Sequence, residues 1–589
     1  MNIIMLLESG KLAEDPEVKK TLKAYSEVCG DHEREACFKI IEGFYNKLRE
    51  LKVSGVDTIW IPIIRSHITP MAFEGKFDYV VGNPPWIAFN RIADPAYQEK
   101  VKDLVVNVYG LVLDAHLMTH MEMATLFLVR SMDLYLKNGG LVGFVMPRAI
   151  FSGDQHDAFR RCAVKRVDYK LLKVIDCEKV EPLFYVPACA VIARKDSKAS
   201  YPVDALIVRG RLPVGERKTI PLDRAREYLK LEPGKLYLNI LGNRTWLDYR
   251  EFRLQRRRSD YYKLFYQGAT IVPQASWLVD VVEQRGNLVV VKSSRRIEAR
   301  SEIKREIPVS PIEKKFIYGV LTSAEVMPFC HLLPNIAVLP IIPMGNRYYI
   351  IHRGRARQLG YKYLVKWLER AEEEWNEIRG AKRERLTLYQ WLDYRRKLSR
   401  QNPGARFKVV YLRSGTHLAS TLVDVEKVCE SNRLLNNVVI DSTLYYYETN
   451  NEDEAYYLVV VLNSNVLDEL IKPMQSKGEF GERDIHKKPL EYPIPKYNPN
   501  NPIHKKLSKL GREASEKART ALPEILKNKK YDRKLEERGV LIPQEVGYVR
   551  MSIRSRLKDI LDQIDSLVLK LFEGETMSKT TLNNFLKTY

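Results

Sequence analysis

The stretch Phe77-Asp-Tyr-Val-Val-Gly-Asn-Pro-Pro-Trp-Ile-Ala-Phe-Asn90 decides how this chain of 589 residues is read. Its apolar run Tyr79 to Val81 is short and largely β-branched and stops at Gly82, which predicts a buried strand of a parallel sheet. Ligands bind where the carboxyl ends of such strands open into loops. The residues that follow Gly82 are therefore expected to form a functional site.

Two consecutive prolines stiffen this loop. Each fixes its own φ and drives the preceding residue toward an extended conformation, so the Asn83 side-chain oxygen and the Pro84 carbonyl are expected to face one point. Two acceptors that bind both N–H groups of an exocyclic amine localise its lone pair and aim it at a methyl donor. Trp86 is placed to stack on the ring. The alternative is a rigid turn without chemistry, because such tripeptides are commonly turns.

With its Phe-Asp-hydrophobic-hydrophobic-hydrophobic-Gly frame, this loop resembles the active-site loop of DNA adenine N6-methyltransferases of the large restriction-modification type. The resemblance implies transfer of a methyl group from S-adenosylmethionine to N6 of an adenine flipped from the duplex. It assigns catalytic roles to Asn83, Pro84, Pro85 and Trp86. It also places Asp78 near the cofactor region, as a cap of the loop more than as a base.

Two later segments resemble parts of the same family. Leu117 to Ile150 is expected to hold a helix that ends at Gly139-Gly140 and a buried strand Leu141 to Met146. Within it, Glu122 stands where the family has an acidic residue near the cofactor. Val174 to Lys195 resembles the last sheet strands. There the family packs an aromatic on the flipped base, and the candidates are Phe184 and Tyr185, with a core role as the alternative.

The segment before the loop lacks the cofactor motif of the family. In the gamma order a Gly-rich turn such as Asp-Pro-x-x-Gly-x-Gly precedes the Asn-Pro-Pro-aromatic loop, yet no GxG occurs before Asn83. A helical pattern at Asp31 to Lys52 and the apolar stretch Thr58 to Ile64 are interpreted as the remaining portion. The apolar stripe of that helix consists of Phe38, Ile41, Phe44 and Leu48.

Half a sheet has an open edge, and an unpaired edge strand must be covered. We therefore expect a second polypeptide that supplies the missing strands and the S-adenosylmethionine motif, as in a split gene. A degenerate enzyme and a truncated gene model are the alternatives.

Positive charge is concentrated in the second part of the chain. Residues 1–200 carry 27 Lys+Arg and 26 Asp+Glu, which leaves 69 and 48 for residues 201–589 and places +21 of the net +22 there. Such a surplus suits a module that binds DNA phosphates. The predicted DNA contacts are Arg256, Arg257, Arg258, Arg295, Arg296, Arg483 and His486, with internal bracing as the alternative for the last two.

The second part is predicted to be a mixed α+β target-recognition region. Strand-like segments occur at Leu288 to Val291, Ala337 to Ile342, Tyr348 to Ile351, Lys408 to Leu412 and Tyr456 to Leu462. Lys366 to Arg400 has a helical pattern, and Ser552 to Phe572 predicts a terminal amphipathic helix. A metal-dependent nuclease needs an acidic residue on one strand and a Glu-x-Lys motif on the next, and no pair of this kind lies in a convincing strand context.

The seven scattered cysteines have no metal-ligand spacing, which predicts reduced thiols and no structural metal. No apolar stretch reaches membrane-spanning length, and we expect a cytoplasmic protein.

The predicted fold is thus α/β, a partial Rossmann-like methyltransferase sheet followed by a mixed α+β region and a C-terminal helix. The predicted domains are 1–205 (partial catalytic domain), 206–510 (target recognition) and 511–589 (helical segment). The predicted function is site-specific adenine N6 methylation of double-stranded DNA. A non-catalytic DNA-recognition subunit and an RNA or protein methyltransferase are the alternatives.

Overall fold

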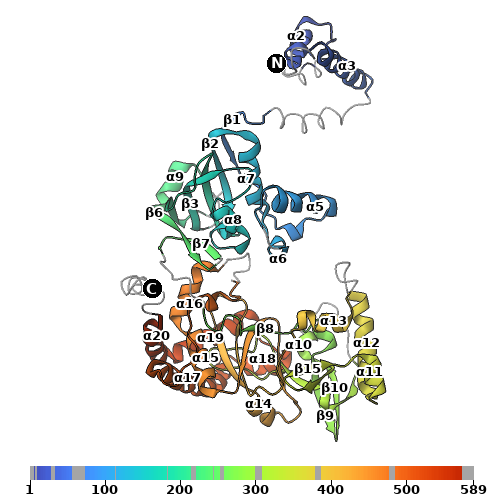
Figure 1. Cartoon of the computed structure of the whole chain (residues 1–589), viewed down its shortest axis with the longest axis vertical. Helices are drawn as coiled ribbons and strands as arrows, with labels where there is room; N and C mark the ends of the chain where they lie inside the picture. The colour runs from blue at the N-terminus through green and yellow to red at the C-terminus, as the bar shows by residue number, and fades with distance from the viewer. Residues whose placement is uncertain are drawn as a thin grey trace. The chain divides into compact units, whose positions relative to one another are not determined.

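The computed structural model describes residues 6, 10–27, 34–55, 73–112, 115–181, 183–213, 220–242, 244–251, 258–298, 308–378, 386–475 and 484–572. The chain divides into two compact units, whose elements are labelled in Figure 1. The first unit comprises Met1–Met146, Cys162–Ile175 and Cys189–Leu206. The second comprises Pro147–Arg161, Asp176–Ala188 and Ile207–Tyr589. The domain boundaries expected from the sequence stay predictions.

Two helices begin the first unit. Helix α2 (Pro16–Ser26) starts at Asp15, whose carboxylate accepts a hydrogen bond from the Glu17 amide at 3.0 Å, and it packs on α3 (Arg34–Val53). The helix predicted at Asp31 to Lys52 is thereby confirmed. Their small core is made by Val18, Leu22, Tyr45 and Leu48, with Phe38 and Ile41 packed against it.

Two details of this region were predicted differently. Phe44 is 49% exposed and so does not belong to the buried stripe. Cys37 forms a disulfide, so the prediction of reduced thiols is wrong for this residue. Sequence spacing alone does not say which cysteines come within the short distance that a disulfide needs. The segment Thr58 to Ile64 lies outside the described residues.

A seven-stranded sheet confirms the predicted α/β class. Its strand order is β1-β2-β4-β3-β5-β6-β7, so β1 is an edge strand. The strands span Phe77–Gly82 (β1), Leu136–Pro147 (β2), Tyr169–Glu181 (β3), Ala188–Lys195 (β4), Val203–Arg211 (β5), Leu229–Leu241 (β6) and Arg244–Asp248 (β7). Strand β1 pairs with β2 in parallel, with Gly82 opposite Phe144, and α7 (Met123–Tyr135) lies beside β1. The predicted parallel strand before the loop is confirmed.

The prediction that this strand is buried is wrong. Tyr79 is 71% exposed and Val81 is 83% exposed. A parallel strand with apolar residues on both faces is normally covered on both faces. Strand β1 pairs with β2 alone among the described residues, and its apolar side chains Tyr79 and Val81 contact solvent.

Glycines 139 and 140 do not end the preceding helix. Helix α7 ends at Tyr135, and both glycines lie within β2. The register of β2 against β1 shifts between the pairs Phe77–Leu136 and Tyr79–Leu141, which accommodates the extra residues as a bulge. Gly139 has a positive φ of 76°, a conformation that suits a bulge as well as a helix end, so the sequence signal is ambiguous.

The second unit contains several small sheets. Four predicted strands are confirmed by β10 (Leu288–Ser293), β13 (Asn335–Val338) with β14 (Ile341–Met344), β15 (Arg347–Ile350) and β16 (Phe407–Leu412). The strand predicted at Tyr456 to Leu462 is wrong, because these residues lie in helix α15 (Glu452–Asn463). This helix is buried on almost every side, and a continuous apolar run does not distinguish a buried strand from a buried helix.

Helices confirm the predicted helical segments of the second unit. Lys366 to Arg400 contains α12 (Lys362–Ile378) and α13 (Leu388–Leu392). The C-terminal helices are α17 (Pro502–Asn528), α18 (Tyr531–Arg538), α19 (Pro543–Arg556) and α20 (Lys558–Phe572), and α15, α17, α19 and α20 lie together in Figure 1. The predicted terminal amphipathic helix is two helices that meet at Leu557, and it packs on the core of its own unit.

Candidate active-site loop and its surroundings

The Asn83–Trp86 loop begins where β1 ends. Gly82 lies opposite Phe144, and a Cβ placed on Gly82 would come within 3.1 Å of the Phe144 ring. Glycine is therefore the residue that lets the strand end close to β2. Asn83 is exposed, Pro84 is buried and Pro85 is exposed, so the buried proline anchors a loop whose first side chain is accessible.

Hydrogen bonds hold the Trp86 ring and the segment that follows it. Its indole Nε1 donates to the Val145 carbonyl at 3.2 Å, which fixes the ring against the end of β2. Beyond it, the Phe89 amide donates to the Met121 carbonyl at 2.8 Å, and the Met123 amide donates to the Ile87 carbonyl at 3.0 Å. The loop is thus tied to the start of α7 by backbone bonds that do not depend on side-chain identity.

This tie places Glu122 next to the loop. Ala88 and Glu122 form an isolated antiparallel β-bridge, and Glu122 is the half-buried N-cap residue of α7. Its side chain makes no capping hydrogen bond. A carboxylate beside the loop is what the resemblance predicts for the cofactor region, and the cofactor role itself stays a prediction.

Asp78 does not cap the loop. Its carboxylate oxygens lie 3.0 and 2.9 Å from Lys137 Nζ on β2, in an ion pair that is largely exposed. Asp78 therefore links β1 to β2 near the start of β1, whereas Asn83 follows the end of that strand.

The Asn83 side chain has no hydrogen-bond partner among the described residues. The Pro84 carbonyl also accepts no hydrogen bond from the described part of the chain. The Asn83 oxygen, on an exposed residue, is therefore available to a bound group, and the carbonyl of the buried Pro84 is not engaged by the described part of the chain. This availability is the property that the proposed chemistry requires, because an acceptor already engaged by the protein would have to be released first.

The predicted base-stacking aromatics lie in the connection from β3 to β4. Phe184 is 43% exposed and Tyr185 is 91% exposed. Neither is a core residue, which disfavours the alternative role proposed for them. They belong to the second unit and Trp86 belongs to the first, so the base sandwich stays a prediction.

The predicted DNA contacts fall into three groups. Arg256, Arg257 and Arg483 lie outside the described residues. Arg295 is 46% exposed and pairs with Asp280 at 2.7 Å, and His486 is partly exposed beside Asp484 at 3.5 Å, so both stay candidates. Arg258 and Arg296 are committed to interactions within the protein.

Arg296 is a buried structural residue. Its side chain is 2% exposed, forms an ion pair with Glu325, and donates to Asn335 Oδ1 and to Thr322 Oγ1, each at 2.9 Å. A guanidinium surrounded in this way has no face for DNA.

Arg258 belongs to a charged cluster around the buried Glu491. Arg258 Nε lies 2.7 Å and Arg244 Nε 3.4 Å from the Glu491 carboxylate, which is 1% exposed. Arg244 also pairs with Asp154, and Lys488 donates to the Asp484 carbonyl at 2.7 Å within the same cluster. The cluster joins β7 to the segments around residues 154 and 490 of the second unit.

Burial lowers the pKa of Lys488 to about 8, against the partial compensation of the Asp154 carboxylate. The unfolded chain binds this proton up to a higher pH than the folded protein. The buried charge of Lys488 therefore lowers the free energy of unfolding by its full amount below about pH 8, and this loss becomes smaller as the pH rises above 8. We expect Lys488→Met to be more stable relative to wild type at pH 7 than at pH 9.5, with a difference of about 2 kcal/mol between these conditions.

Urea unfolding of both proteins across this range measures that difference. A gap between Lys488→Met and wild type that stays constant with pH would show that burial does not lower the pKa of Lys488.

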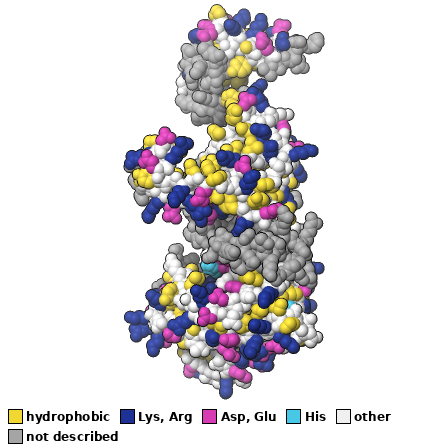
Figure 2. All heavy atoms as spheres, turned by 90° about the vertical axis from the view of Figure 1, so that its left-hand side faces the viewer, with side chains coloured by type: hydrophobic (Ala, Val, Ile, Leu, Met, Phe, Trp, Pro, Cys, Tyr) yellow, Lys and Arg dark blue, Asp and Glu magenta, His cyan; other side chains and the backbone are white. Residues whose placement is uncertain are grey.

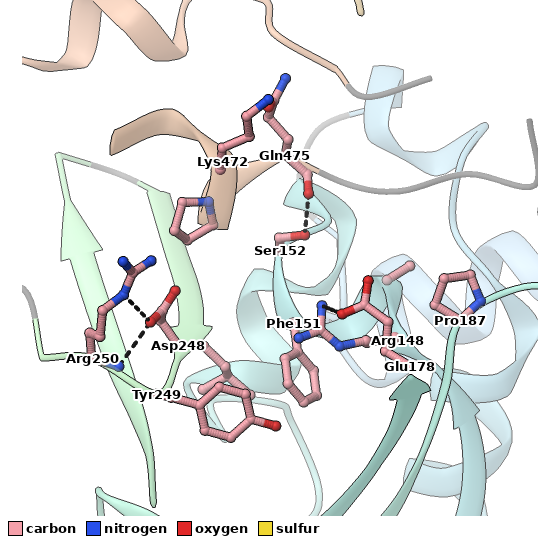
Figure 3. A pocket seen from close by; sticks show the side chains of 13 residues that line it. Arg148, Phe151, Ser152, Glu178, Pro187, Asp248, Tyr249, Arg250, Lys472 and Gln475 are labelled. Carbon is pink, nitrogen blue, oxygen red and sulfur yellow. Dashed lines mark hydrogen bonds and ion pairs between the residues drawn. The ribbon is translucent and has the colours of Figure 1, made fainter. Parts of the chain in front are cut away.

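Sequence reasoning missed a network centred on Arg148. The Arg148 Nε lies 3.1 and 3.0 Å from the two Asp176 oxygens, its Nη1 lies 3.2 Å from Glu178, and its guanidinium covers the Phe151 ring. The Tyr249 hydroxyl donates to Asp176 at 2.6 Å. Figure 3 shows Arg148, Glu178, Tyr249 and Arg250 around one cavity. The available signal was an arginine directly after Pro147, at the end of a predicted strand.

The distribution of surface charge does not by itself locate a DNA-binding surface. On the face drawn in Figure 2, Lys and Arg side chains are interspersed with Asp and Glu side chains. A DNA-binding surface must therefore be located from specific groups and not from a single-sign field. Among the described residues no His, Cys, Asp and Glu side chains group as metal ligands, and no helix is both long and apolar enough to cross a membrane.

Comparison with known proteins identifies the segment that contains the loop. Residues 28–184 match the family model of the Eco57I restriction-modification methylase. The predicted resemblance is confirmed. The restriction-modification methylase segment includes Asn83 to Trp86, Asp78, Glu122 and Phe184. A search of curated proteins finds no match.

Solved structures of restriction-modification enzymes are similar to the chain. The type IIL enzyme MmeI in complex with DNA has 10% identity and a TM-score of 0.47 over 86% of this chain and 57% of its own. The type IIG restriction endonuclease BpuSI has 13% identity and a TM-score of 0.23, over 85% of this chain and 55% of its own. The DrdV–DNA complex has 12% identity and a TM-score of 0.37, over 78% of this chain and 46% of its own. The chain thus spans roughly half the length of these proteins.

Proposed function

We propose that this chain is the catalytic-loop part of a site-specific DNA adenine N6-methyltransferase of a restriction-modification or related defence system. The observation that supports the proposal most is an accessible Asn83-Pro84-Pro85-Trp86 loop at the carboxyl end of a parallel strand. This loop lies within a segment that matches a restriction-modification methylase. A cytoplasmic location follows from a DNA substrate.

In this proposal the chain binds and orients the adenine amine. The Asn83 side-chain oxygen and the Pro84 carbonyl accept its two N–H groups, and the lone pair on N6 is thereby directed away from the ring. Trp86, already held by the Val145 carbonyl, stacks on the base. A second stacking aromatic, for which Phe184 and Tyr185 are the candidates, stays a prediction. Pro85 keeps the loop from relaxing when the base enters.

S-adenosylmethionine supplies an electrophilic methyl group when it is bound. The described residues offer one fitting carboxylate, Glu122, beside the loop. The described part of the chain has no Gly-rich turn after a strand to hold the rest of the cofactor. We therefore infer that the cofactor site is completed by a partner protein.

The free edge of β1 is the proposed place for that partner. Only β2 pairs with β1 among the described residues, and the exposed side chains of β1 include Phe77, Tyr79 and Val81, at 38, 71 and 83%. An apolar edge strand of this kind calls for a neighbouring strand and for covering side chains on both faces. A polypeptide that carries parallel strands and the S-adenosylmethionine motif supplies both.

We expect Val81→Lys to abolish association with this partner, because it places an ammonium group in the apolar contact. The measurement is co-purification and calorimetric titration with the product of the neighbouring upstream gene. Val282→Lys is a matched control, since Val282 is 50% exposed on strand β9 (Val279–Arg285) of the second unit. Equal binding by Val81→Lys and wild type would place the partner elsewhere.

The second candidate function is a DNA-recognition subunit without catalysis. The missing Gly-rich turn favours it, whereas the complete and accessible Asn-Pro-Pro-Trp loop disfavours it. The two functions separate in one experiment, in which methyl transfer to duplex DNA is followed by digestion and detection of N6-methyladenine. An RNA or protein substrate would appear in the same assay as transfer to those polymers and not to DNA.

A further inference from the structure

A polar groove in the second unit lies around Arg148 (Figure 3). It consists of two adjoining cavities of about 160 and 480 Å³, which share Arg148, Glu178, Asp248, Tyr249 and Arg250 in their walls. We call these two cavities the Arg148 groove. Segments that lie far apart in the sequence meet there: the start of η3 (Arg148–Phe151), the end of β3, the end of β7, and η9 (Lys472–Met474).

Positive charge predominates in the lining of the groove. The cations are Arg148, Lys179, Arg209, Arg250 and Lys472, and the anions are Asp176, Glu178 and Asp248. The three carboxylates already have cationic partners: Asp176 and Glu178 pair with Arg148, and Asp248 accepts from Arg250 Nε at 3.1 Å. Of the other cations, Arg209 pairs with Glu232 and Lys472 pairs with Asp468, each at 3.4 Å. The positive charge of the lining that has no counter-charge among the described residues is therefore that of Lys179.

Some polar atoms of the lining have no partner among the described residues. Arg148 engages Asp176 through Nε and Glu178 through Nη1. Gln475 is 4% exposed, and its Oε1 atom is buried without a hydrogen bond, although its Nε2 donates to Gly415 at 3.2 Å. A buried polar atom without a partner costs free energy, which a bound group with its hydration water can recover.

Lys179 is the most accessible cation of the groove. It is exposed at the end of β3, and no ion pair within the described residues engages it. A lysine of this kind is a point charge suited to a phosphate, and Arg148 lines the same cavity.

We propose that the Arg148 groove binds the phosphodiester backbone of the DNA. The inference rests on the DNA-binding part of the proposed function. The smaller cavity is below the size that drug-sized ligands need, and it suits a compact anionic group. The larger cavity extends the same positive lining along Lys179 and Arg209, as a continuous polyanion requires.

The test is the salt dependence of DNA binding, measured by fluorescence anisotropy with a mixed-sequence duplex and no cofactor. The variants are Lys179→Gln, Arg250→Gln and the double variant, in the full chain. Each lost phosphate contact is expected to reduce the slope of log K against log salt by about 1, so the double variant loses about 2. The control is Lys173→Gln, an equal charge change at an exposed lysine on the same strand but outside the groove.

Unchanged slopes in Lys179→Gln and the double variant, with unchanged thermal unfolding, would overturn the proposal. An equal reduction in Lys173→Gln would also overturn it, because the effect would then be general charge. Failure of methyl transfer with the expected slopes would contradict the proposed catalysis and leave the groove intact. If the wild-type chain binds no DNA at all, the proposal that the Arg148 groove binds the DNA backbone is overturned.

Discussion

Replacement of Asn83 by alanine is expected to reduce methyl transfer to DNA by about 10²–10³-fold, with the fold unchanged. Asn83 is exposed and makes no hydrogen bond to the described part of the chain, so its removal leaves no buried group unsatisfied. The loss would therefore be chemical. It corresponds to one of two acceptors that hold the adenine amine in its reactive form.

The measurement is initial rate under saturating DNA, together with thermal unfolding of the same preparation. A matched control is Asn90→Ala, since Asn90 is an exposed asparagine a few residues beyond the loop. Full activity in Asn83→Ala would contradict the role given to the loop. An equal loss in Asn90→Ala would show that the effect is not specific to the acceptor position.

Disruption of the Arg296–Glu325 ion pair is expected to have the largest effect on stability. Glu325→Ala leaves the Arg296 guanidinium buried without its counter-charge, which typically costs about 3–5 kcal/mol. Glu325 also accepts hydrogen bonds from the Thr322 amide and hydroxyl at 2.9 and 2.7 Å, and these are lost together with the pair. The second unit should therefore unfold at a markedly lower denaturant concentration.

The neighbouring arginine provides the control. Arg295→Ala removes an exposed pair with Asp280, and such pairs contribute at most about 1 kcal/mol. Denaturant unfolding of Glu325→Ala, Arg295→Ala and wild type compares the two sites. Similar stability of all three proteins would show that Arg296 is not buried as described, and its predicted role in DNA binding would be open again.

The sequence predicted those features that depend on local pattern. The strand before Gly82, the stiff loop after it and the strand at Leu141 to Met146 follow from short apolar runs that are ended by Gly or Pro. These signals require no knowledge of distant contacts.

Features that depend on tertiary neighbours were predicted less well. Burial of β1 was expected from its composition, yet the covering strand is not among the described residues. The strand expected at Tyr456 to Leu462 is a buried helix, and apolar periodicity does not separate the two. Arg296 was taken for a DNA contact because runs of basic residues are commonly exposed, and its partners Glu325 and Asn335 lie tens of residues away in the sequence.

The Arg148 network shows the same limit. Arg148, Asp176 and Tyr249 stand in three separate segments, and none has a motif around it that indicates the other two. A groove of this kind becomes visible only when the segments are brought together.

The most direct measurement is transfer of radiolabelled methyl groups from S-adenosylmethionine to mixed-sequence duplex DNA, with this chain alone and with the product of the neighbouring upstream gene. We expect N6-methyladenine only when both proteins are present, and its loss when Asn83→Ala replaces the wild-type chain. Transfer by this chain alone would contradict the need for a partner. No transfer in either case, with DNA binding intact, would contradict the catalytic role and favour a DNA-recognition subunit.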